Sequence, residues 1–299
     1  MALVLNNVTK KFGEHTAVDN LTIDVSKEEL FGFLGGNGAG KTTTFRMILG
    51  LLDQTEGTIF WNNEPINYEK SHLIGYLPEE RGLFPKLSVE EQLIYLGKLR
   101  GMNKRSVRKE INKWLDLFKI PQYLKQKIEE LSKGNQQKIQ FISAVLHKPE
   151  LLILDEPFSG LDPINVEMIK EAIYELKQKG TTIVFSSHQM AHVEEMCENL
   201  CILHQGKPVV QGNLRQIKQS YDRKNVTIYA DMSLEFLRQF TGVISYQDVI
   251  GGCKLQIENE TVSQQIFSAL QNKGFVRKFE VEELSLSDIF IEKVGASYE

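Results

Sequence analysis

The feature that most constrains this chain is a glycine-rich segment between an apolar run and a helical stretch. Residues 35–42 read Gly-Gly-Asn-Gly-Ala-Gly-Lys-Thr, which matches in full the pattern G-x-x-x-x-G-K followed by Ser or Thr. The apolar run at 30–34 suits a buried strand, and residues 43–52 suit a helix. In such a strand–loop–helix unit, backbone N–H groups and the positive end of the helix bind phosphate oxygens. The segment therefore predicts an α/β fold that binds a nucleoside triphosphate.

The residue types in this loop have identifiable chemical roles. Glycines at 35, 38 and 40 allow backbone conformations that a side chain would block. Lys41 is expected to reach the β- and γ-phosphates of ATP, and the Thr42 hydroxyl is expected to bind Mg²⁺. The residues predicted to contact the nucleotide in this loop are Gly35, Asn37, Gly38, Ala39, Gly40, Lys41, Thr42 and Thr43.

The bulk composition narrows the class of protein. The chain has 299 residues, of which 41% are hydrophobic and 25% charged, as in a folded protein with one large or two ordinary domains. Its net charge of −4 does not favour nucleic-acid binding. The three cysteines show no Cys-x-x-Cys spacing, so neither a disulfide framework nor a zinc knuckle is expected. No secretory signal or apolar run of about 18 residues is visible, so any membrane role is expected to come through a partner.

Short strand patterns alternate with helical stretches over the first two thirds of the chain. Strand patterns lie at 3–8, 21–25, 58–61 and 74–77, a solid apolar run lies at 151–154, and a further buried strand is expected at 181–185. Solid runs are typical of strands buried on both faces of a parallel sheet. A capping-box pattern at Ser88 and Glu91 opens a region of helical periodicity. We predict a domain over residues 1–220 with a parallel sheet core, an antiparallel β subdomain and a helical insertion at about 85–148.

A polar, basic stretch at 213–224 marks the predicted boundary of a second domain, residues 222–299. Strand patterns lie there at 226–230, 243–249, 254–257 and 275–281, and helical patterns at 234–240, 262–273 and 285–294. The first six of these elements have the order of a ferredoxin-like α+β unit. This domain has no cluster of acids or histidines suited to chemistry, which favours an interaction or regulatory role.

Polar residues follow two of the buried strands. Asp155 and Glu156 come directly after the run 151–154, and His188 follows the run 181–185 through two serines. Because the carboxyl ends of parallel strands meet at one edge of a sheet, we expect these side chains to lie beside the loop. Asp155 suits the Mg²⁺ shell, Glu156 suits a general base for water, and His188 suits a donor to the γ-phosphate. The alternative for the two acids is a solvated strand end.

A second helix start carries a possible anion site. In the segment Leu131–Asn135, Ser132 is a good N-cap and Gly134 leaves the backbone exposed. Taken alone, this is an ordinary helix start, but its free N–H groups are also suited to bind phosphate.

In their order and spacing, these motifs resemble the ATP-binding subunit of an ABC transporter over about residues 2–220. The resemblance implies that 35–42 is the Walker A loop, 151–156 the Walker B strand ending in the catalytic Glu156, and 131–135 the ABC signature. It also implies a D-loop at 159–162, a switch histidine at His188, and stacking of adenine on Phe12.

The same resemblance implies a set of partners. Two cassettes are expected to meet head to tail as a homodimer, so that Ser132 and Gly134 of each copy complete the ATP site of the other. Integral membrane permease subunits are expected to dock on the helical insertion. The chain would then lie at the cytoplasmic face of the cell membrane and couple ATP hydrolysis, with Mg²⁺ as cofactor, to transport.

Three motifs depart from the usual family pattern. Glu79 stands where a glutamine that binds Mg²⁺ is commoner, and its carboxylate retains the ability to bind the metal. Lys133 and Asn135 alter the signature, and Gly36 replaces a proline. With the ending Leu284–Phe290, these departures resemble an exporter branch that includes sodium-extruding and drug- or peptide-exporting ATPases. We therefore expect export of a small solute.

Two other functions stay open at this stage. One is an ABC ATPase that transports nothing and acts as a regulatory or translation-associated factor, which the single set of motifs and the net charge of −4 disfavour. The other is a regulatory ATP sensor without turnover, which the presence of Glu156 and His188 disfavours.

Overall fold

The computed structural model describes residues 2–80, 82–271 and 273–295. The chain divides into two compact units, Met1–Gln211 and Gly212–Glu299. Helix α7 (Leu214–Gln219) has no buried residue and belongs to the second unit. The first domain was expected to extend to residue 220. Residue 81, in the segment that carries Glu79, and residues 296–299 of the predicted second domain lie outside the described residues.

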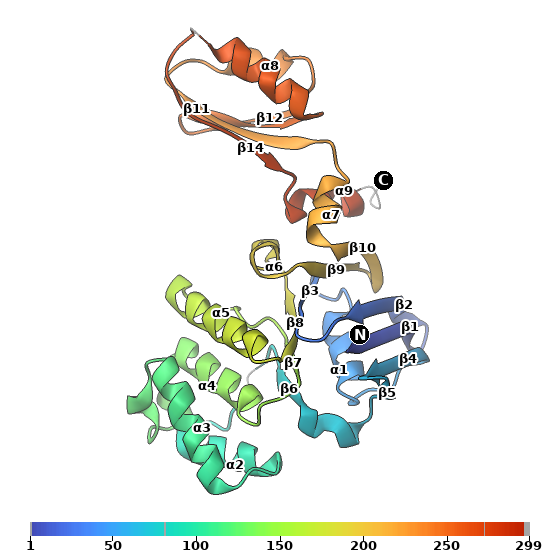
Figure 1. Ribbon diagram of the computed structural model, residues 1–299, viewed down its shortest axis with the longest axis vertical. Coiled ribbons are helices and arrows are strands. Elements are labelled where there is room, and N and C mark those ends of the chain that lie inside the picture. The colour runs from blue at the N-terminus through green and yellow to red at the C-terminus, as the bar shows by residue number, and fades with distance from the viewer. Residues whose placement is uncertain (1, 81, 272, 296–299) are drawn as a thin grey trace. The chain divides into compact units, whose positions relative to one another are not determined.

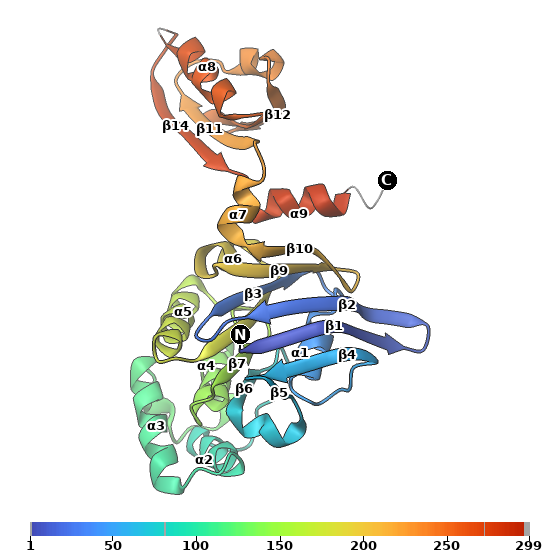
Figure 2. The same ribbon diagram turned by 45° about the vertical axis from the view of Figure 1, so that its right-hand side comes forward.

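The first unit is built on two sheets (Figures 1 and 2). The larger sheet has the strand order β10–β9–β3–β8–β7–β6, and the smaller has the order β2–β1–β4–β5. In the larger sheet, β3 pairs in parallel with β8 and β9, and β7 pairs in parallel with β6 and β8. In the smaller sheet the pairings are antiparallel. The predicted parallel core and antiparallel β subdomain are thus confirmed.

The strands of these two sheets have the following bounds. Those of the larger sheet are β3 (Leu30–Gly35), β6 (Ile74–Leu77), β7 (Leu151–Leu154), β8 (Thr182–Ser187), β9 (Asn199–His204) and β10 (Lys207–Asn213). Those of the smaller sheet are β1 (Leu3–Phe12), β2 (His15–Val25), β4 (Glu56–Trp61) and β5 (Glu64–Pro65). All residues of β3 and β7 are buried, as expected for strands covered on both faces.

Helix α1 (Lys41–Ile48) packs into the core between the two sheets. Its Phe45 is fully buried, and its ring centroid lies 5.5 Å from that of Phe33 on β3. The prediction that this helix continues to Leu52 was wrong, because Gly50 adopts a φ of 66°, a left-handed conformation that commonly ends helices. The packing of α1 against β3 fixes both ends of the loop between them.

Helices cover the other side of the parallel sheet and extend beyond it (Figure 1). Helix α5 packs on β8, α6 packs on β3 and β8, and α4 packs on β6 and α2. The helical bounds are α2 (Val89–Leu99), α3 (Lys104–Leu117), α4 (Lys133–Val145), α5 (Pro163–Gln178) and α6 (Met190–Met196), with 3₁₀ turns at Tyr68–Leu73, Pro121–Tyr123 and Ile128–Glu130. Ser88 and Glu91 form the predicted capping box at the start of α2. No helix within the described ranges has the length and apolar character needed to cross a membrane.

The second unit contains an antiparallel sheet with the order β12–β13–β11–β14. Its elements are β11 (Lys224–Ala230), η4 (Glu235–Gln239), β12 (Val243–Val249), β13 (Gly252–Ile257), α8 (Glu260–Leu270), β14 (Val276–Glu283) and α9 (Leu286–Gly295). This strand order confirms the predicted ferredoxin-like arrangement. The predicted helix at 234–240 is instead a short 3₁₀ turn, Glu235–Gln239, with Leu234 as its N-cap and Leu237 fully buried.

Candidate active site

The glycine-rich loop joins β3 to α1 at the carboxyl end of the parallel sheet. Gly40 is the N-cap of α1 with a φ of 105°, and a Cβ on it would lie 2.6 Å from the Ala17 carbonyl oxygen. A Cβ on Gly35 would lie 2.6 Å from the carbonyl oxygen of Leu203. Glycine is therefore required at both ends of the loop, because neighbouring backbone lies too close for any side chain.

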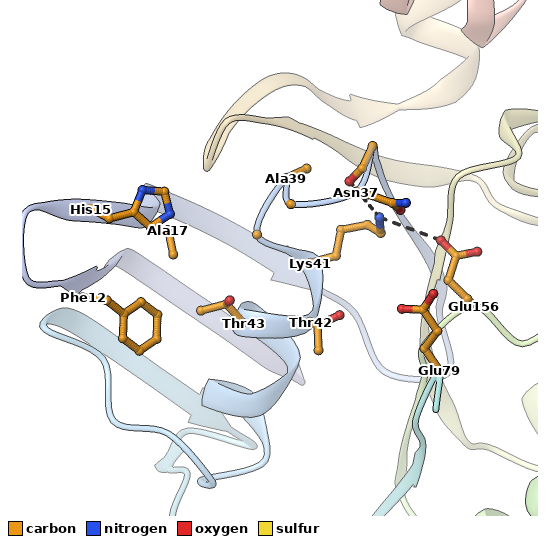
Figure 3. A pocket seen from close by; sticks show the side chains of 13 residues that line it. Phe12, His15, Ala17, Asn37, Ala39, Lys41, Thr42, Thr43, Glu79 and Glu156 are labelled. Atoms are coloured by element: carbon orange, nitrogen blue, oxygen red, sulfur yellow. Dashed lines mark hydrogen bonds and ion pairs between the residues drawn. The ribbon is translucent and has the colours of Figure 1, made fainter. Parts of the chain in front are cut away.

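A cleft of about 510 Å³ opens over this loop (Figure 3). Its lining combines the loop with residues from both sheets: Phe12, His15, Ala17, residues 36–43, Glu79 and Glu156. Phe12 is half exposed, and in Figure 3 it lies across the loop from Glu79 and Glu156. The cleft thus has an aromatic wall on one side and an acidic wall on the other, with N–H donors of the loop and the first turn of α1 between them.

Lys41 places a buried positive charge at the base of the cleft. Its Nζ donates hydrogen bonds to the carbonyl oxygens of Gly35 at 2.7 Å and Gly36 at 3.2 Å. It lies 3.8 Å from Glu156 Oε1. Because only 7% of Lys41 is exposed, its charge acts in an environment where water screens little.

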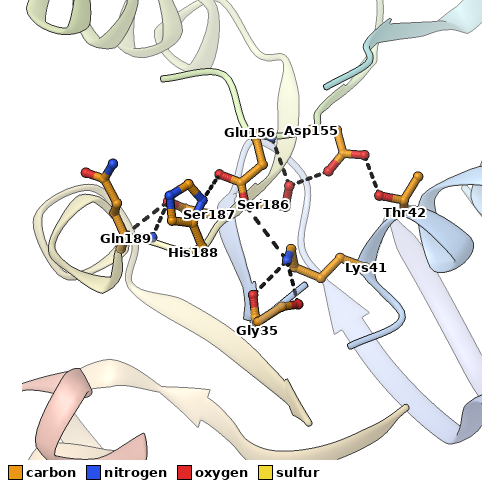
Figure 4. A network of polar contacts seen from close by, with 10 residues as sticks. Gly35, Lys41, Thr42, Asp155, Glu156, Ser186, Ser187, His188 and Gln189 are labelled. Atoms are coloured by element: carbon orange, nitrogen blue, oxygen red, sulfur yellow. Dashed lines mark hydrogen bonds and ion pairs between the residues drawn. The ribbon is translucent and has the colours of Figure 1, made fainter. Parts of the chain in front are cut away.

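Asp155 is connected to the loop and to the neighbouring strand (Figure 4). Thr42 Oγ1 donates to Asp155 Oδ2 at 2.8 Å, and Ser186 Oγ donates to Asp155 Oδ1 at 2.6 Å. The same Ser186 oxygen accepts a hydrogen bond from the Glu156 backbone N–H at 3.0 Å. Ser186, at the end of β8, thus fixes the position of both acids.

Glu156 lies next to these groups in a strained backbone conformation, with a φ of 51°. Its Oε2 lies 2.8 Å from His188 Nδ1, as Figure 4 shows, and its Oε1 is buried without a hydrogen-bond partner among the described residues. Burial raises the pKa of Glu156, and the nearby His188 and Lys41 oppose this shift only in part. A carboxylate with a raised pKa and a free oxygen is well suited to accept a proton.

The oxygen atoms near Thr42 suit Mg²⁺. The Thr42 hydroxyl and the Asp155 carboxylate already touch, and the Glu79 carboxyl lines the same cleft. Within the ranges that the structure describes, no cluster of three or more His, Cys, Asp or Glu side chains forms a metal cage. Mg²⁺ commonly binds through one or two protein oxygens together with substrate phosphates and water. Thr42, Asp155 and Glu79 therefore fit a metal that arrives with a nucleotide.

The signature residues lie at the start of α4, and neither Ser132 nor Gly134 is among the residues that line the cleft. Ser132 caps the helix, since its Oγ accepts a hydrogen bond from the Asn135 N–H at 3.3 Å. A Cβ on Gly134 would lie 2.9 Å from the Asn165 amide nitrogen near the start of α5. A side chain at position 134 would therefore require the Asn165 side chain to move.

The structure brings most of the predicted residues together and adds two that sequence reasoning missed. The loop, Phe12, Glu79, Asp155, Glu156 and His188 form one connected site. The hydroxyl of Ser186 connects the acids, and the ring of His15 lines the cleft. The signal for His15 was its position: it pairs with Phe12 across the turn between β1 and β2. The signal for Ser186 was its place near the end of β8, a strand that ends beside the acids.

Comparisons with known proteins agree with this site. A family model described as "ABC transporter" matches residues 18–159. A second model, described as the C-terminal domain of DrrA1-3-like ATP-binding proteins, matches residues 212–294. The two matches fall in the two compact units of the chain.

Individual relatives cover nearly the whole chain. The ABC transporter ATP-binding protein YhaQ of Bacillus subtilis (strain 168) is 63% identical over 297 residues, 99% of this chain and 100% of the relative. The bacitracin transport ATP-binding protein BcrA of Bacillus licheniformis is 31% identical over 304 residues, 97% of this chain and 96% of the relative.

Solved structures agree with the first unit. A structure described as the ATP binding subunit of an ABC transporter has a TM-score of 0.69 and 30% sequence identity, and the match covers 74% of this chain and 93% of that one. A dimeric bacterial ABC transporter cassette, MJ0796, has a TM-score of 0.66 and 25% identity over 71% of this chain and 99% of that one. This chain therefore belongs to the family of ABC transporter ATP-binding subunits, and it carries a DrrA-like C-terminal domain.

Proposed function

We propose that this chain hydrolyses ATP with Mg²⁺ to power the export of a small solute through a separate membrane permease. One observation carries the hydrolytic part. Glu156 lies at the end of β7 with a raised pKa and a carboxylate oxygen that has no hydrogen-bond partner among the described residues, beside Lys41 and His188. A buried acid in this position is poised to take a proton from a water that attacks the γ-phosphate.

Each residue of the site has a distinct part in this mechanism. Lys41 and the loop N–H groups bind the phosphates and offset the negative charge that develops during transfer. Thr42, Asp155 and Glu79 hold Mg²⁺, which supplies further neutralisation of charge on the phosphates when bound. Glu156 accepts the proton of the attacking water, and His188 steadies the water or the γ-phosphate by hydrogen bonding. Phe12 offers an exposed ring on which adenine stacks.

The position of Ser132 and Gly134 supports a head-to-tail dimer. These residues are exposed or half-buried at the start of α4 and do not line the cleft of their own chain. Free N–H groups at a helix start suit a phosphate, and Lys133 adds a positive charge there. We infer that they complete the ATP site of a second copy; the related MJ0796 cassette is described as dimeric.

A second cleft supports the proposed permease contact. It has a volume of about 480 Å³ and is lined by residues of β6, α2, α4 and the end of α1. Leu51 and Leu99 line it with exposed fractions of 57% and 65%, so part of its wall is exposed and apolar. An apolar segment of a membrane partner fits such a surface. Docking there would place the chain at the cytoplasmic face of the membrane.

The direction of transport and the class of solute rest on the relatives. The bacitracin transport protein matches this chain over nearly its full length, and a Nod factor export protein of Cupriavidus metallidurans (strain ATCC 43123 / DSM 2839 / NBRC 102507 / CH34) does so at 32% identity. We propose export of a small solute, such as sodium, a drug or a peptide.

The test is ATP hydrolysis by the purified chain, alone and together with a candidate permease subunit. We expect Mg²⁺-dependent hydrolysis that the permease stimulates and that Glu156→Gln strongly lowers in both samples. Hydrolysis that the permease leaves unchanged would instead support an ATPase without a transport role.

A further inference from the structure

The segment that carries Glu79 is held by a buried side chain of α4. Gln140 lies in the middle of this helix and is 2% exposed. Its Nε2 donates one hydrogen bond to the Pro78 carbonyl at 3.0 Å and another to the Glu80 carbonyl at 3.1 Å. These are the two carbonyl groups that flank Glu79 in the chain. The Gln140 carboxamide therefore binds the backbone on both sides of Glu79, which lines the cleft.

The rest of this segment offers fewer restraints. It leaves β6 after Leu77, and Glu79 and Glu80 are exposed. A Cβ on Gly82 would meet no atom within 4 Å, so the backbone there has open space around it. Among the described residues, the next hydrogen bond along the segment is at Phe84, whose N–H donates to Oε1 of the fully buried Gln92 on α2 at 2.8 Å. Within the same residues, the hydrogen bonds of Gln140 are the ones nearest to Glu79.

Burial makes the Gln140 contact strong. The buried group is the Gln140 amide, and a buried donor that loses its hydrogen bonds has no water to replace them. The Oε1 atom of Gln140 has no hydrogen-bond partner among the described residues, so the polar contacts of the carboxamide are made by its donor side. A side chain required only for packing would not need this polar group, and methionine fills a similar volume without it.

We propose that Gln140 is a positioning residue for Glu79, which it aims at the metal-binding oxygens of Thr42 and Asp155. The inference rests on the proposed function, in which Glu79 helps to hold Mg²⁺. Gln140 does not touch the nucleotide or the metal; it acts through the backbone of Glu79. Supporting groups one step removed from a metal site commonly change metal affinity by about 10–100-fold when they are removed.

Gln137, on the same helix, makes a similar contact with the segment that carries Glu156. Its Nε2 donates to the carbonyl of Pro157 at 3.3 Å, directly after Glu156. Helix α4 thus holds both acid-bearing segments through side chains one turn apart. Its first residues belong to the signature, so a shift of α4 would be transmitted to both acids.

The test uses two variants of Gln140. Gln140→Met keeps the length of the side chain and removes both N–H donors. Gln140→Glu replaces the amide donor by a carboxylate oxygen that repels the two carbonyls. His147→Leu is the matched control, because His147 follows the same helix and contacts the Ile74 carbonyl at 3.2 Å, at the far end of β6. The main readout is the Mg²⁺ concentration that half-saturates binding of a fluorescent, non-hydrolysable ATP analogue. Hydrogen–deuterium exchange of the segment 78–84 is measured without nucleotide.

In both Gln140 variants we expect the half-saturating Mg²⁺ concentration to rise by about 10-fold and exchange in the segment to become faster. The control should change neither. In a Glu79→Ala background, adding Gln140→Met should produce less than about a 2-fold further change, because residues that act through one another are not additive. If one Gln140 variant fails to fold, the other carries the comparison.

An unchanged Mg²⁺ requirement in a folded Gln140 variant, or an equal shift with and without Glu79, would overturn the proposal. These binding and exchange measurements do not require turnover. A wild-type chain that binds the analogue but hydrolyses no ATP would contradict the proposed function while leaving the positioning role of Gln140 open to this test.

Discussion

Thr42 Oγ1 donates a 2.8 Å hydrogen bond to Asp155 Oδ2, although the two residues are 113 positions apart in the chain. The contact joins the first turn of α1 to the end of β7, and so joins the phosphate-binding loop to the acidic wall of the cleft. It brings together two oxygen groups of the kind that Mg²⁺ prefers. The geometry at this point supports the following predictions.

Glu156→Gln should lower ATP turnover by ~10²–10⁴-fold, the usual contribution of a general base. Glutamine has the same size and can keep a contact with His188, so nucleotide binding should be retained. Steady-state phosphate release and equilibrium binding of ATP measure the two effects. The control is Glu171→Gln, at an exposed position on α5. Turnover near the wild-type rate in Glu156→Gln would contradict the assignment.

Lys41→Ala should act on binding as well as on turnover. Hydrogen bonds from a charged donor contribute about 1.5–3 kcal/mol, so the dissociation constant for ATP should rise by roughly 10–100-fold. Equilibrium binding of a fluorescent ATP analogue measures this change. Lys27→Ala removes an exposed lysine from the same unit and should leave affinity unchanged. Equal affinities for wild type and Lys41→Ala would show that the lysine does not contact the phosphates.

Ser186→Ala should affect stability and turnover together. Its hydroxyl is fully buried and contacts both Asp155 and the Glu156 N–H, so its loss should cost about 1–3 kcal/mol of unfolding free energy. Both acids lose their common support, so turnover should also fall. Chemical denaturation and phosphate release provide the measurements. Ser187→Ala is the control, since the Ser187 hydroxyl contacts only the backbone of Gln189 among the hydrogen bonds described.

His147 should make the first unit sensitive to acid. Burial, followed by the charge of Arg100, lowers the pKa of His147 from 6.5 to about 4. The unfolded chain therefore takes up a proton at a higher pH than the folded chain does. Stability that is present above about pH 6.5 should be lost as the pH falls towards about 4, by up to roughly 3 kcal/mol.

Denaturation curves measured at several pH values test this effect. His147→Gln keeps a donor for the Ile74 carbonyl but does not titrate, so it should lose less stability than wild type between pH 6.5 and 4. Parallel loss of stability in the two proteins would rule out His147 as the source.

The errors made from the sequence have local physical causes. The strands β9 and β10 were not predicted, although β9 pairs directly with β3. The run 200–203 in β9 is as long and as buried as that of β7, so its signal was present in the sequence, whereas β10 has a single buried residue, Val210. Gly50 marks the end of α1, a signal that was present in the sequence but was outweighed by the general helical pattern. The i, i+3 spacing of Leu234 and Leu237 fits an α-helix as well as a 3₁₀ turn, so it did not separate the two.

Local sequence alone determined the phosphate loop, most of the strands and helices, and the acids that follow β7. These features depend on neighbours in the chain: glycine at positive φ, lysine and threonine at the helix start, and an apolar run before two acids. The family and the ferredoxin-like order of the second unit were predictable for the same reason.

Only the tertiary structure showed that the Ser186 hydroxyl bonds both Asp155 and the Glu156 N–H. It also showed that Gln140 donates hydrogen bonds to the backbone on both sides of Glu79. Serine and glutamine are common residues with no distinctive pattern, and their partners lie 30 or more positions away. Which hydrogen bonds such side chains form is decided by strand pairing and helix packing, since a buried polar group must use whatever partner the fold places within reach.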